Sequence, residues 1–185
     1  VALGAYGMAY RTENGGDSWT LAIDGIDNPD RYHFYSLARD SNGRLHASGE
    51  AGLPYYSDDA GISWTRTYDI YDGSLFALVT DKGAIYAIGL RGNVFRSTDG
   101  GESWANVTLE GSGSLYAGVG TDAGKLVLVG TGGRVVYSDD GGQTFVESIH
   151  PSRSALSDVV MDGDRLLLAS MSGFFAEALE NYNGN

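Results

Sequence analysis

Side-chain oxygens recur along this chain at a spacing that could bind a cation or close a turn. A Ser or Thr is followed two residues later by Asp or Asn, then by Gly, and then by a large aromatic residue. Four copies carry this pattern: Thr12-x-Asn14-x-Gly16-x-x-Trp19, Ser57-x-Asp59-x-Gly61-x-x-Trp64, Ser97-x-Asp99-x-Gly101-x-x-Trp104 and Ser138-x-Asp140-x-Gly142-x-x-Phe145. An EF-hand calcium loop needs further ligands at its fifth and ninth positions and a Glu at its twelfth, and that spacing does not occur here. The pattern therefore predicts a structural turn and no metal site.

The residue types explain how such a turn would hold itself together. The Asp or Asn oxygen can accept hydrogen bonds from backbone amides two residues on, and the Gly can adopt the positive φ that other residues resist. The Ser or Thr hydroxyl closes a second local bond, and the aromatic side chain turns back as an apolar anchor between neighbouring sheets. Each copy is expected to act as a clip between two strands.

The spacing of these turns shows that the chain repeats a unit of about forty residues. A glycine that opens a paired-glycine turn stands eight residues before each Ser or Thr. The four paired-glycine turns are Gly4-Ala5-Tyr6-Gly7, Gly49-Glu50-Ala51-Gly52, Gly89-Leu90-Arg91-Gly92 and Gly130-Thr131-Gly132-Gly133, and a degenerate fifth is Ser170-Met171-Ser172-Gly173. Between the turns lie apolar runs of four to seven residues, which are typical of strands. The sequence predicts an all-β β-propeller whose blades are four-stranded antiparallel meanders.

The turn motif resembles the Asp-box, or bacterial neuraminidase repeat. The finer pattern from Gly89 to Trp104 resembles the photosystem II assembly and stability factor family of propellers. Within a blade, with strands A to D counted from the axis, the Asp-box turn joins C to D and the paired-glycine turn joins B to C. The two kinds of turn are therefore expected on opposite rims of the ring.

The repeat register predicts an incomplete ring within a single propeller domain, 1–185, or a portion of one. The expected repeat units are 1–33, 34–73, 74–113, 114–153 and 154–185. The chain opens inside strand B of one blade and stops after strand C of another, so four to five blades are covered, as part of a ring of about seven. A compact five-bladed ring is the alternative, although closing it would duplicate strands B and C. A degenerate fifth box would fall near 178–185.

Composition and charge narrow the class of protein. The chain has 185 residues, no cysteine and a formal net charge of -12. Without cysteine there is neither a disulfide nor a thiolate metal site, and three histidines give no ligand spacing, so no cofactor is expected. Nucleic-acid binding needs a basic surface, which this chain lacks. No apolar run reaches the ~20 residues that span a membrane, and no signal peptide is recognisable. The resemblance implies an extracytoplasmic location: periplasmic, lumenal or secreted.

The resemblance also implies a function, namely a non-catalytic binding or assembly scaffold for a protein partner. That partner would be a membrane protein or a complex under assembly. Function in propellers gathers at the mouth of the central channel, on the rim that carries the B to C turns and the D to A connections. The candidate binding residues there are Tyr6, Asp27, Asp30, Arg31, His33, Glu50, Asp69, Tyr71, Asp72, Arg91, His150 and Arg153. The first D to A connection, 22–33, is the longest, and such insertions often carry binding chemistry.

Two further hypotheses follow from the resemblance. The name neuraminidase suggests a sialidase-like glycoside hydrolase or a glycan-binding propeller, for which acidic rim residues such as Asp27, Asp69 and Asp72 could supply a carboxylate pair. The Arg-Ile-Pro signature of sialidases does not occur, so we expect no catalytic residues. The binding role of the assembly-factor family has been associated with a patch of arginines, and the residues that match by repeat position are Arg11, Arg91, Arg96 and Arg134.

Overall fold

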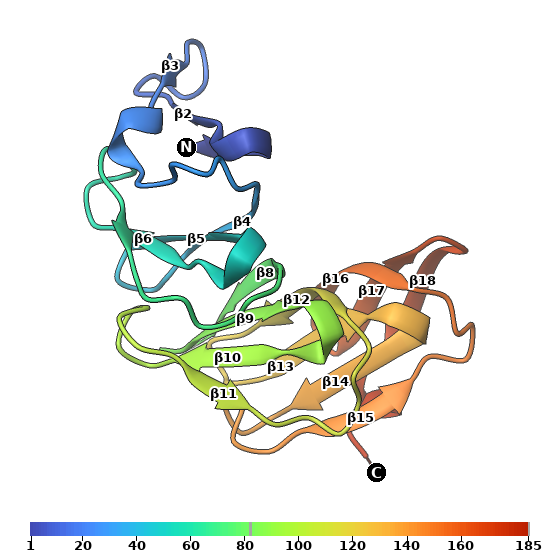
Figure 1. The fold of residues 1–185 in the computed structure, drawn as a ribbon. Helices are drawn as coiled ribbons and strands as arrows, with labels where there is room; N and C mark the ends of the chain where they lie inside the picture. Colours follow the sequence, from blue (N-terminus) through green and yellow to red (C-terminus); the bar gives the residue numbers. More distant parts are fainter. Residues whose placement is uncertain (82, 185) are drawn as a thin grey trace.

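The computed structural model describes residues 1–81 and 83–184, and within these the chain forms strands, turns and short 3₁₀ helices. The strands make five antiparallel sheets of three or four strands each. The sheets follow one another along the chain and stand side by side in an arc (Figure 1). The predicted all-β architecture is confirmed, and each sheet corresponds to one propeller blade.

Neighbouring strands in each sheet are consecutive in sequence, so every blade is a meander. The first sheet contains β1 (Ala2–Leu3), β2 (Ala9–Arg11) and β3 (Thr20–Leu21). The second contains β4 (Phe34–Arg39), β5 (Leu45–Gly49), β6 (Tyr55–Ser57) and β7 (Thr65–Arg66). The third contains β8 (Leu75–Thr80), β9 (Ile85–Gly89), β10 (Val94–Ser97) and β11 (Ala105–Val107). The fourth contains β12 (Leu115–Gly120), β13 (Leu126–Gly130), β14 (Arg134–Ser138) and β15 (Val146–Ile149), and the fifth contains β16 (Leu156–Asp162), β17 (Arg165–Ser170) and β18 (Gly173–Ala178).

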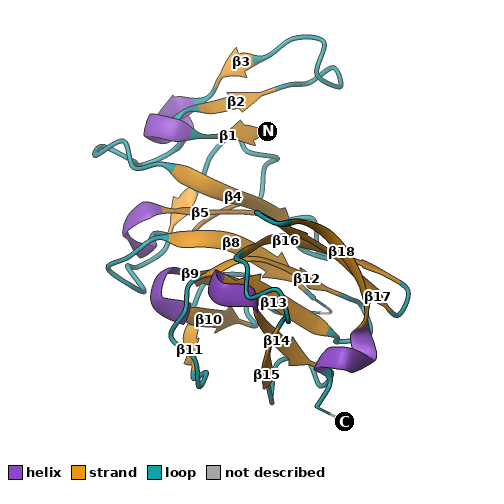
Figure 2. Ribbon diagram, turned by 90° about the vertical axis from the view of Figure 1, so that its right-hand side faces the viewer, coloured by secondary structure: helices purple, strands orange, loops and turns teal. Residues whose placement is uncertain are grey.

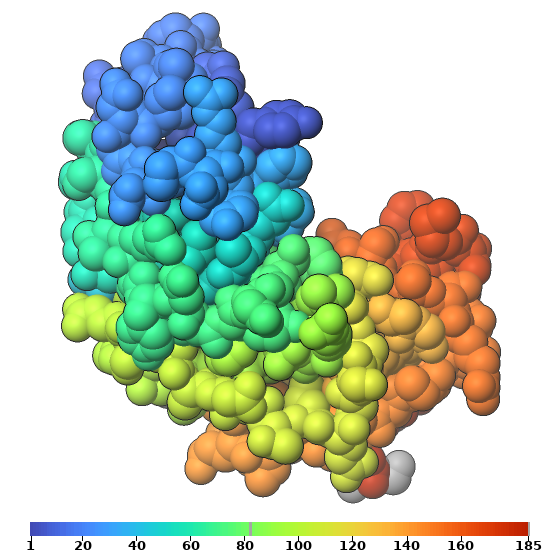
Figure 3. Space-filling view, in the orientation of Figure 1, coloured from blue at the N-terminus to red at the C-terminus, as the bar shows by residue number. Residues whose placement is uncertain are grey.

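The strands β4, β8, β12 and β16 contact one another in succession, so they are the inner strands that surround the axis. The first sheet starts at the second strand position, and the last sheet ends at the third, as the register predicted. The first and last sheets are separate among the described residues, and a wide notch lies between them in the space-filling view (Figure 3). The alternative closure into five blades is therefore not formed, while the total of about seven blades stays a prediction.

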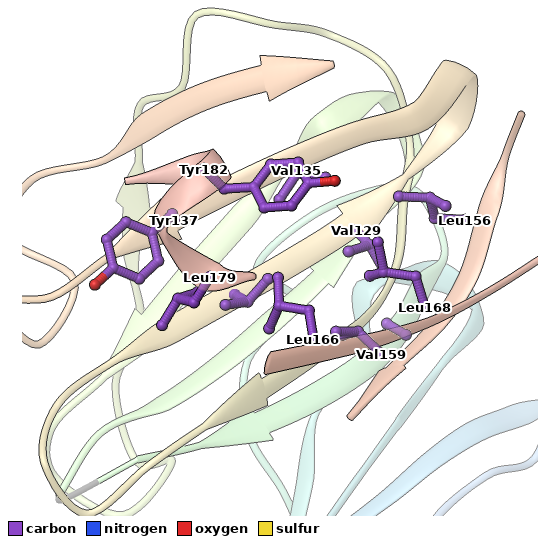
Figure 4. Packing of buried hydrophobic residues seen from close by; sticks show 11 residues of the cluster. Val129, Val135, Tyr137, Leu156, Val159, Leu166, Leu168, Leu179 and Tyr182 are labelled. Carbon is purple, nitrogen blue, oxygen red and sulfur yellow. The ribbon is translucent and has the colours of Figure 1, made fainter. Parts of the chain in front are cut away.

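A short helix stands where the degenerate fifth Asp-box was expected. This helix, η6 (Leu179–Tyr182), contacts β14 and β15 of the preceding sheet. Its Leu179 and Tyr182 are buried in the apolar layer between the fourth and fifth sheets (Figure 4). In that layer Val129 lies beside Leu168 from the next sheet, and Tyr137 lies beside Leu179. Interleaved side chains of this kind hold each blade to the next one.

The Asp-box turns have the hydrogen bonds that the motif predicts. In the second box, Asp59 Oδ1 accepts from Ser57 Oγ at 2.8 Å and from the amides of Ile62 at 3.0 Å and Ser63 at 2.9 Å. These amides lie three and four residues on, not two, and the turn between them passes through the left-handed backbone of Ala60 at φ 58° and Gly61 at φ 81°. Hydrogen bonds from the Ser63 hydroxyl and amide lower the pKa of Asp59 to about 2. The box is a closed turn whose carboxylate is already satisfied.

The aromatic anchors differ with their position in the arc. Trp64 is buried between the first and second sheets, in contact with the cluster that includes Phe34 and Tyr55. Trp19 is 47% exposed, because the first sheet has no neighbouring sheet on its leading side among the described residues. The Asn in the first box keeps the turn, since Asn14 Oδ1 accepts from the Ser18 amide at 3.0 Å.

Candidate functional site on the upper rim

Four turns of one geometry occupy one rim of the arc, which we call the upper rim. They are the 3₁₀ helices η1 (Ala5–Gly7), η3 (Glu50–Gly52), η4 (Leu90–Gly92) and η5 (Thr131–Gly133), and they gather toward the left side in Figure 2. The central residue of each has a left-handed backbone: Tyr6 at φ 57°, Ala51 at 57°, Arg91 at 59° and Gly132 at 68°. The side chain at this position projects from a turn whose shape does not depend on it.

Three of the four turns are held by their backbone against the chain that enters the inner strand. The amide of Glu50 donates to His33 O at 3.0 Å, that of Leu90 to Ser74 O at 3.0 Å, and that of Thr131 to Ser114 O at 2.9 Å. The glycine before each of these three turns permits this approach. A Cβ on Gly49 would lie 1.9 Å from His33 O, closer than any side chain can come. The paired-glycine motif thus places the turn beside the start of the inner strand.

The inner strands begin with a β-bulge that repeats in four sheets. The pairing register shifts between Phe34 and Ser36, between Leu75 and Ala77, between Leu115 and Ala117, and between Leu156 and Asp158. The extra residue at each bulge is Tyr35, Phe76, Tyr116 or Ser157. A bulge re-aims a side chain away from the regular alternation of the strand. Three successive blades therefore present an aromatic ring from the same place.

These rings form a continuous series across the first four blades, which we call the aromatic arc: Tyr6, His33, Tyr35, Phe76 and Tyr116. Successive ring centroids are separated by 4.6, 6.4, 5.8 and 5.6 Å. Tyr6 is 69% exposed, Tyr35 44% and Tyr116 37%, while His33 and Phe76 are partly buried. Aromatic side chains that remain exposed in a row on one rim are a feature of binding surfaces.

Polar groups fix the orientation of two of these rings. The Tyr35 hydroxyl donates to Glu50 Oε1 at 3.3 Å, and Glu50 Oε2 accepts from the His33 amide at 2.8 Å. In the fourth blade the Thr131 hydroxyl donates to the Tyr116 hydroxyl at 3.1 Å. Partial burial, followed by the Glu50 carboxylate, raises the pKa of Tyr35. In the second and fourth blades, the first side chain of the upper-rim turn therefore positions the aromatic ring of the inner strand.

The residues predicted for this rim divide into three groups. The structure places Tyr6 and His33 in the aromatic arc and Glu50 against it, bonded to the His33 amide and the Tyr35 hydroxyl. The predicted residues that are exposed on turns or connections outside it are Asp27, Asp30, Arg31, Asp69, Asp72, Arg91 and Arg153. Asp69 forms an ion pair with Arg66, and Tyr71 packs against Phe95.

His150 does not lie at the surface as we expected. It is only 2% exposed, its ring packs against Phe175 at 4.4 Å between centroids, and its Nδ1 bonds to Ser152 Oγ at 2.8 Å. Burial by the fifth blade removes this residue from the binding candidates, because the connection that carries it turns inward between two sheets.

The arginines matched by repeat position also do not form one patch. Arg134 is 3% exposed and bonded through Nε and Nη2 to Glu147, with Nη1 on Gly113 O at 2.7 Å. Arg11 and Arg96 stand at the Asp-box end of their strands, whereas Arg91 is on the upper rim. A strand length separates the two positions, so the repeat spacing could not bring these side chains together.

Sequence reasoning missed the three bulge residues Tyr35, Phe76 and Tyr116. The available signal was an aromatic residue directly after a buried Phe34, Leu75 or Leu115 at the start of each inner strand. In a regular strand that residue would point to the opposite face of the blade from its neighbour. Only the bulge turns all three toward one rim, and a bulge is not readable from the apolar pattern.

Neither a metal-binding cluster nor a membrane-spanning helix occurs among the described residues. In the described part of the chain no group of three or more His, Cys, Asp or Glu side chains is placed to hold a metal ion. The helices of residues 1–81 and 83–184 are all too short and too polar to cross a bilayer.

Blades of antiparallel meanders, clipped by repeated Ser-x-Asp-x-Gly turns around one axis, define a β-propeller of the Asp-box type. The model of the BNR/Asp-box repeat matches residues 55–66, which span the second box. A comparison with curated protein sequences gives no match.

Solved structures similar to this chain are propellers. YCF48 bound to D1 peptide is 19% identical, with a TM-score of 0.64, and the match covers 98% of this chain and 64% of that one. YCF48 from Cyanidioschyzon merolae is 20% identical, with a TM-score of 0.70 and coverage of 96% and 62%. Virginiamycin B lyase from Staphylococcus aureus is 11% identical, with a TM-score of 0.69 and coverage of 96% and 68%. The chain thus spans less than two thirds of either YCF48 chain, and at these identities the likeness establishes the fold alone.

Proposed function

We propose that this chain is a non-catalytic binding scaffold whose partner is an extended protein segment lying along the aromatic arc. The observation that carries the proposal is the row of rings at the inner-strand bulges. Tyr35, Phe76 and Tyr116 recur at 5.8 and 5.6 Å between centroids. Alternate side chains of an extended segment are about 6.6 Å apart, so every second side chain could meet one ring. Rigid aromatic side chains supply contact area at a low entropic cost.

The comparisons support a protein partner over a chemical reaction. YCF48 is a propeller bound to a D1 peptide, and it is similar to nearly the whole of this chain. By the same resemblance, the partner is a membrane protein or a complex under assembly, met outside the cytoplasm. The Glu50 carboxylate lies against the aromatic arc, and both of its oxygens accept hydrogen bonds, one from the His33 amide and one from the Tyr35 hydroxyl. Most glycoside hydrolases use a pair of carboxyl groups about 5 to 10 Å apart at the scissile bond, whereas the hydrogen bonds of the arc involve one carboxylate, that of Glu50.

A peptide-display selection tests the proposal directly. The wild-type chain would be used to select binders from a random library of 15-residue peptides, with counter-selection on a Tyr35→Ala, Tyr116→Ala double variant. Selected peptides should bind the wild type and lose at least about tenfold in affinity on either single variant, as aromatic contacts at interface centres do. Tyr68→Ala is the matched control, because Tyr68 is 54% exposed and its hydroxyl contacts Trp104 rather than the aromatic arc.

The selection separates the competing functions. Failure to recover any peptide whose affinity depends on the arc would refute the proposal. A glycan array run with the same variants covers the alternative, since sugars also stack on aromatic rings. Binding of a glycan that is lost in Tyr35→Ala, without any such peptide, would favour the glycan-binding function instead.

A further inference from the structure

The end of the aromatic arc at the first and second blades forms a corner that the other blades lack. Tyr6 meets His33 edge to face, with centroids 4.6 Å apart and planes 71° apart. His33 meets Tyr35 in the same manner, at 6.4 Å and 72°. Three rings whose planes are successively near perpendicular form a corner, and two of them, Tyr6 and Tyr35, are exposed to solvent.

A carboxylate completes this corner. Glu50 lies against Tyr35 and the His33 backbone, with both oxygens held in place. The equivalent position holds Leu90 in the third blade and Thr131 in the fourth, and the position of His33 is taken by Ser74 and Ser114. The second blade therefore differs from the next two in having both an additional ring and a negative charge. That combination of aromatic faces with a carboxylate suits a cationic side chain.

The upper-rim turn of the first blade presents the ring of Tyr6 to this corner. Tyr6 occupies the left-handed position of that turn, at φ 57°, and its ring is 69% exposed. The same position holds Ala51, Arg91 and Gly132 in the next three blades. Of these four blades, the first is therefore the one that presents a ring from the turn.

The surrounding charge is also negative. The adjoining connection, 22–33, has Asp24, Asp27 and Asp30 against the single cation Arg31, and the whole chain carries a net charge of -12. A field of this sign attracts cations and disfavours an acidic segment.

We propose that the corner of Tyr6, His33, Tyr35 and Glu50, here called the cation corner, accepts a lysine or arginine side chain of the bound segment. This inference rests on the proposed function, because the rest of the segment is placed on Phe76 and Tyr116. It specifies the partner as an extended segment with a basic residue at one end of an alternating apolar stretch.

The display selection described above gives the first readout. Peptides that depend on Tyr116 should be enriched in Lys or Arg at one position near an end. Arc-dependent peptides without such enrichment would overturn this inference and leave the proposed function standing. A selection without any arc-dependent peptide would contradict the proposed function and this inference with it.

Substitution on both sides of the contact gives the second readout. Replacing the basic residue of a selected peptide by norleucine should weaken binding to the wild type about tenfold, as expected for a cation held by aromatic faces and a carboxylate. The same replacement should have little effect on binding to Glu50→Gln or Tyr6→Gly. Equal loss in the wild type and in both variants would overturn the assignment. Exchange of Lys for Arg shows which cation the corner prefers.

Two variants control for charge and folding. Asp72→Asn removes one negative charge from an exposed position on the same rim outside the cation corner, so it should leave the lysine preference intact. Equal effects of Asp72→Asn and Glu50→Gln would show that only the overall charge matters and would overturn the proposal. Tyr6→Gly suits the left-handed backbone, so loss of the lysine preference in that variant cannot be attributed to unfolding. Thermal melts of all variants confirm this.

Discussion

Replacement of Asp99 by Ala should lower the melting temperature by several degrees, whereas Asp99→Asn should be nearly neutral at pH 7. The Asp99 carboxylate accepts from Ser97 Oγ at 2.8 Å, from the Ser103 amide at 2.9 Å and from the Ser103 hydroxyl. Each such bond contributes about 0.5 to 1.5 kcal/mol net. Water can replace the lost partners at this exposed turn, so the lower part of the range applies. Loss of all three predicts about 2 kcal/mol.

For a chain of this length, 1 kcal/mol shifts the melting temperature by about 2 to 4 °C, so Asp99→Ala should melt about 4 to 8 °C below the wild type. The first box shows why Asn is tolerated. Asn14 Oδ1 accepts from the Ser18 amide at 3.0 Å, and its Nδ2 donates to the Ser18 hydroxyl at 2.9 Å. The amide thus reproduces the contacts of the carboxylate, and Asp99→Asn should cost less than about 0.5 kcal/mol.

The assay is thermal unfolding by circular dichroism at a series of pH values. Hydrogen bonds from Ser103 lower the pKa of Asp99 to about 2. Because this folded-state pKa lies below the unfolded value of about 4, the stabilisation by ionised Asp99 is complete above pH 4 and is lost as the pH falls toward 2. Any advantage of the wild type over Asp99→Asn should therefore shrink in acid. An Asp99→Ala variant as stable as the wild type, or an Asp99→Asn variant as damaged as Asp99→Ala, would refute the clip mechanism.

Three further predictions concern other positions in the repeat. Ala60→Gly should raise stability by about 1 kcal/mol, measured by urea unfolding, because Ala60 holds a left-handed φ of 58°; an unchanged midpoint would contradict this. Gly89→Ala should cost about 3 kcal/mol or prevent folding, since its Cβ would lie 2.1 Å from Ser74 O, whereas Gly4→Ala, with open space around it, should melt like the wild type. Burial lowers the pKa of His46 more than its hydrogen bond to a neighbouring Asp raises it, so its contribution to stability should be lost as the pH falls below about 6.5. His46→Gln should flatten that part of the stability profile, and an unchanged slope would refute the assignment.

The architecture was readable from the sequence because each turn is determined locally. The Asp-box residues bond to one another within a few positions, so their types and spacing specify the turn without any knowledge of the rest of the fold. Three of the glycines that open the paired-glycine turns are required by contacts with a segment more distant in the sequence. Gly49 and Gly89 are required by carbonyl groups of the preceding connection, and the repeat alone revealed their position. Strand register, blade order and the two rims all followed from these turns.

The candidate site was only partly readable, because it depends on contacts between segments. Tyr6, His33 and Glu50 were recognised as rim residues from the register, but nothing local showed that they share one corner. The prediction that His150 lies exposed on the rim was wrong for the converse reason, since a neighbouring blade covers it. The bulge that exposes Tyr35 has no signature in an apolar strand. Side chains whose place is set by backbone irregularity or by the next blade lie beyond what periodicity can predict.

The two rims use opposite means of stabilisation, and this explains why one of them can bind. On the Asp-box rim the side chains themselves close the turn, so Ser97 and Asp99 can be replaced without loss of stability only by residues that keep these bonds, as Thr12 and Asn14 do in the first box. On the upper rim the turn is closed by backbone bonds, such as that from Leu90 N to Ser74 O. The first side chain of that turn is therefore free to differ, and it is Glu50 in one blade and Thr131 in another. A rim whose geometry is independent of its side chains can acquire binding chemistry blade by blade, and the proposed cation corner lies at the second blade, with its ring and carboxylate.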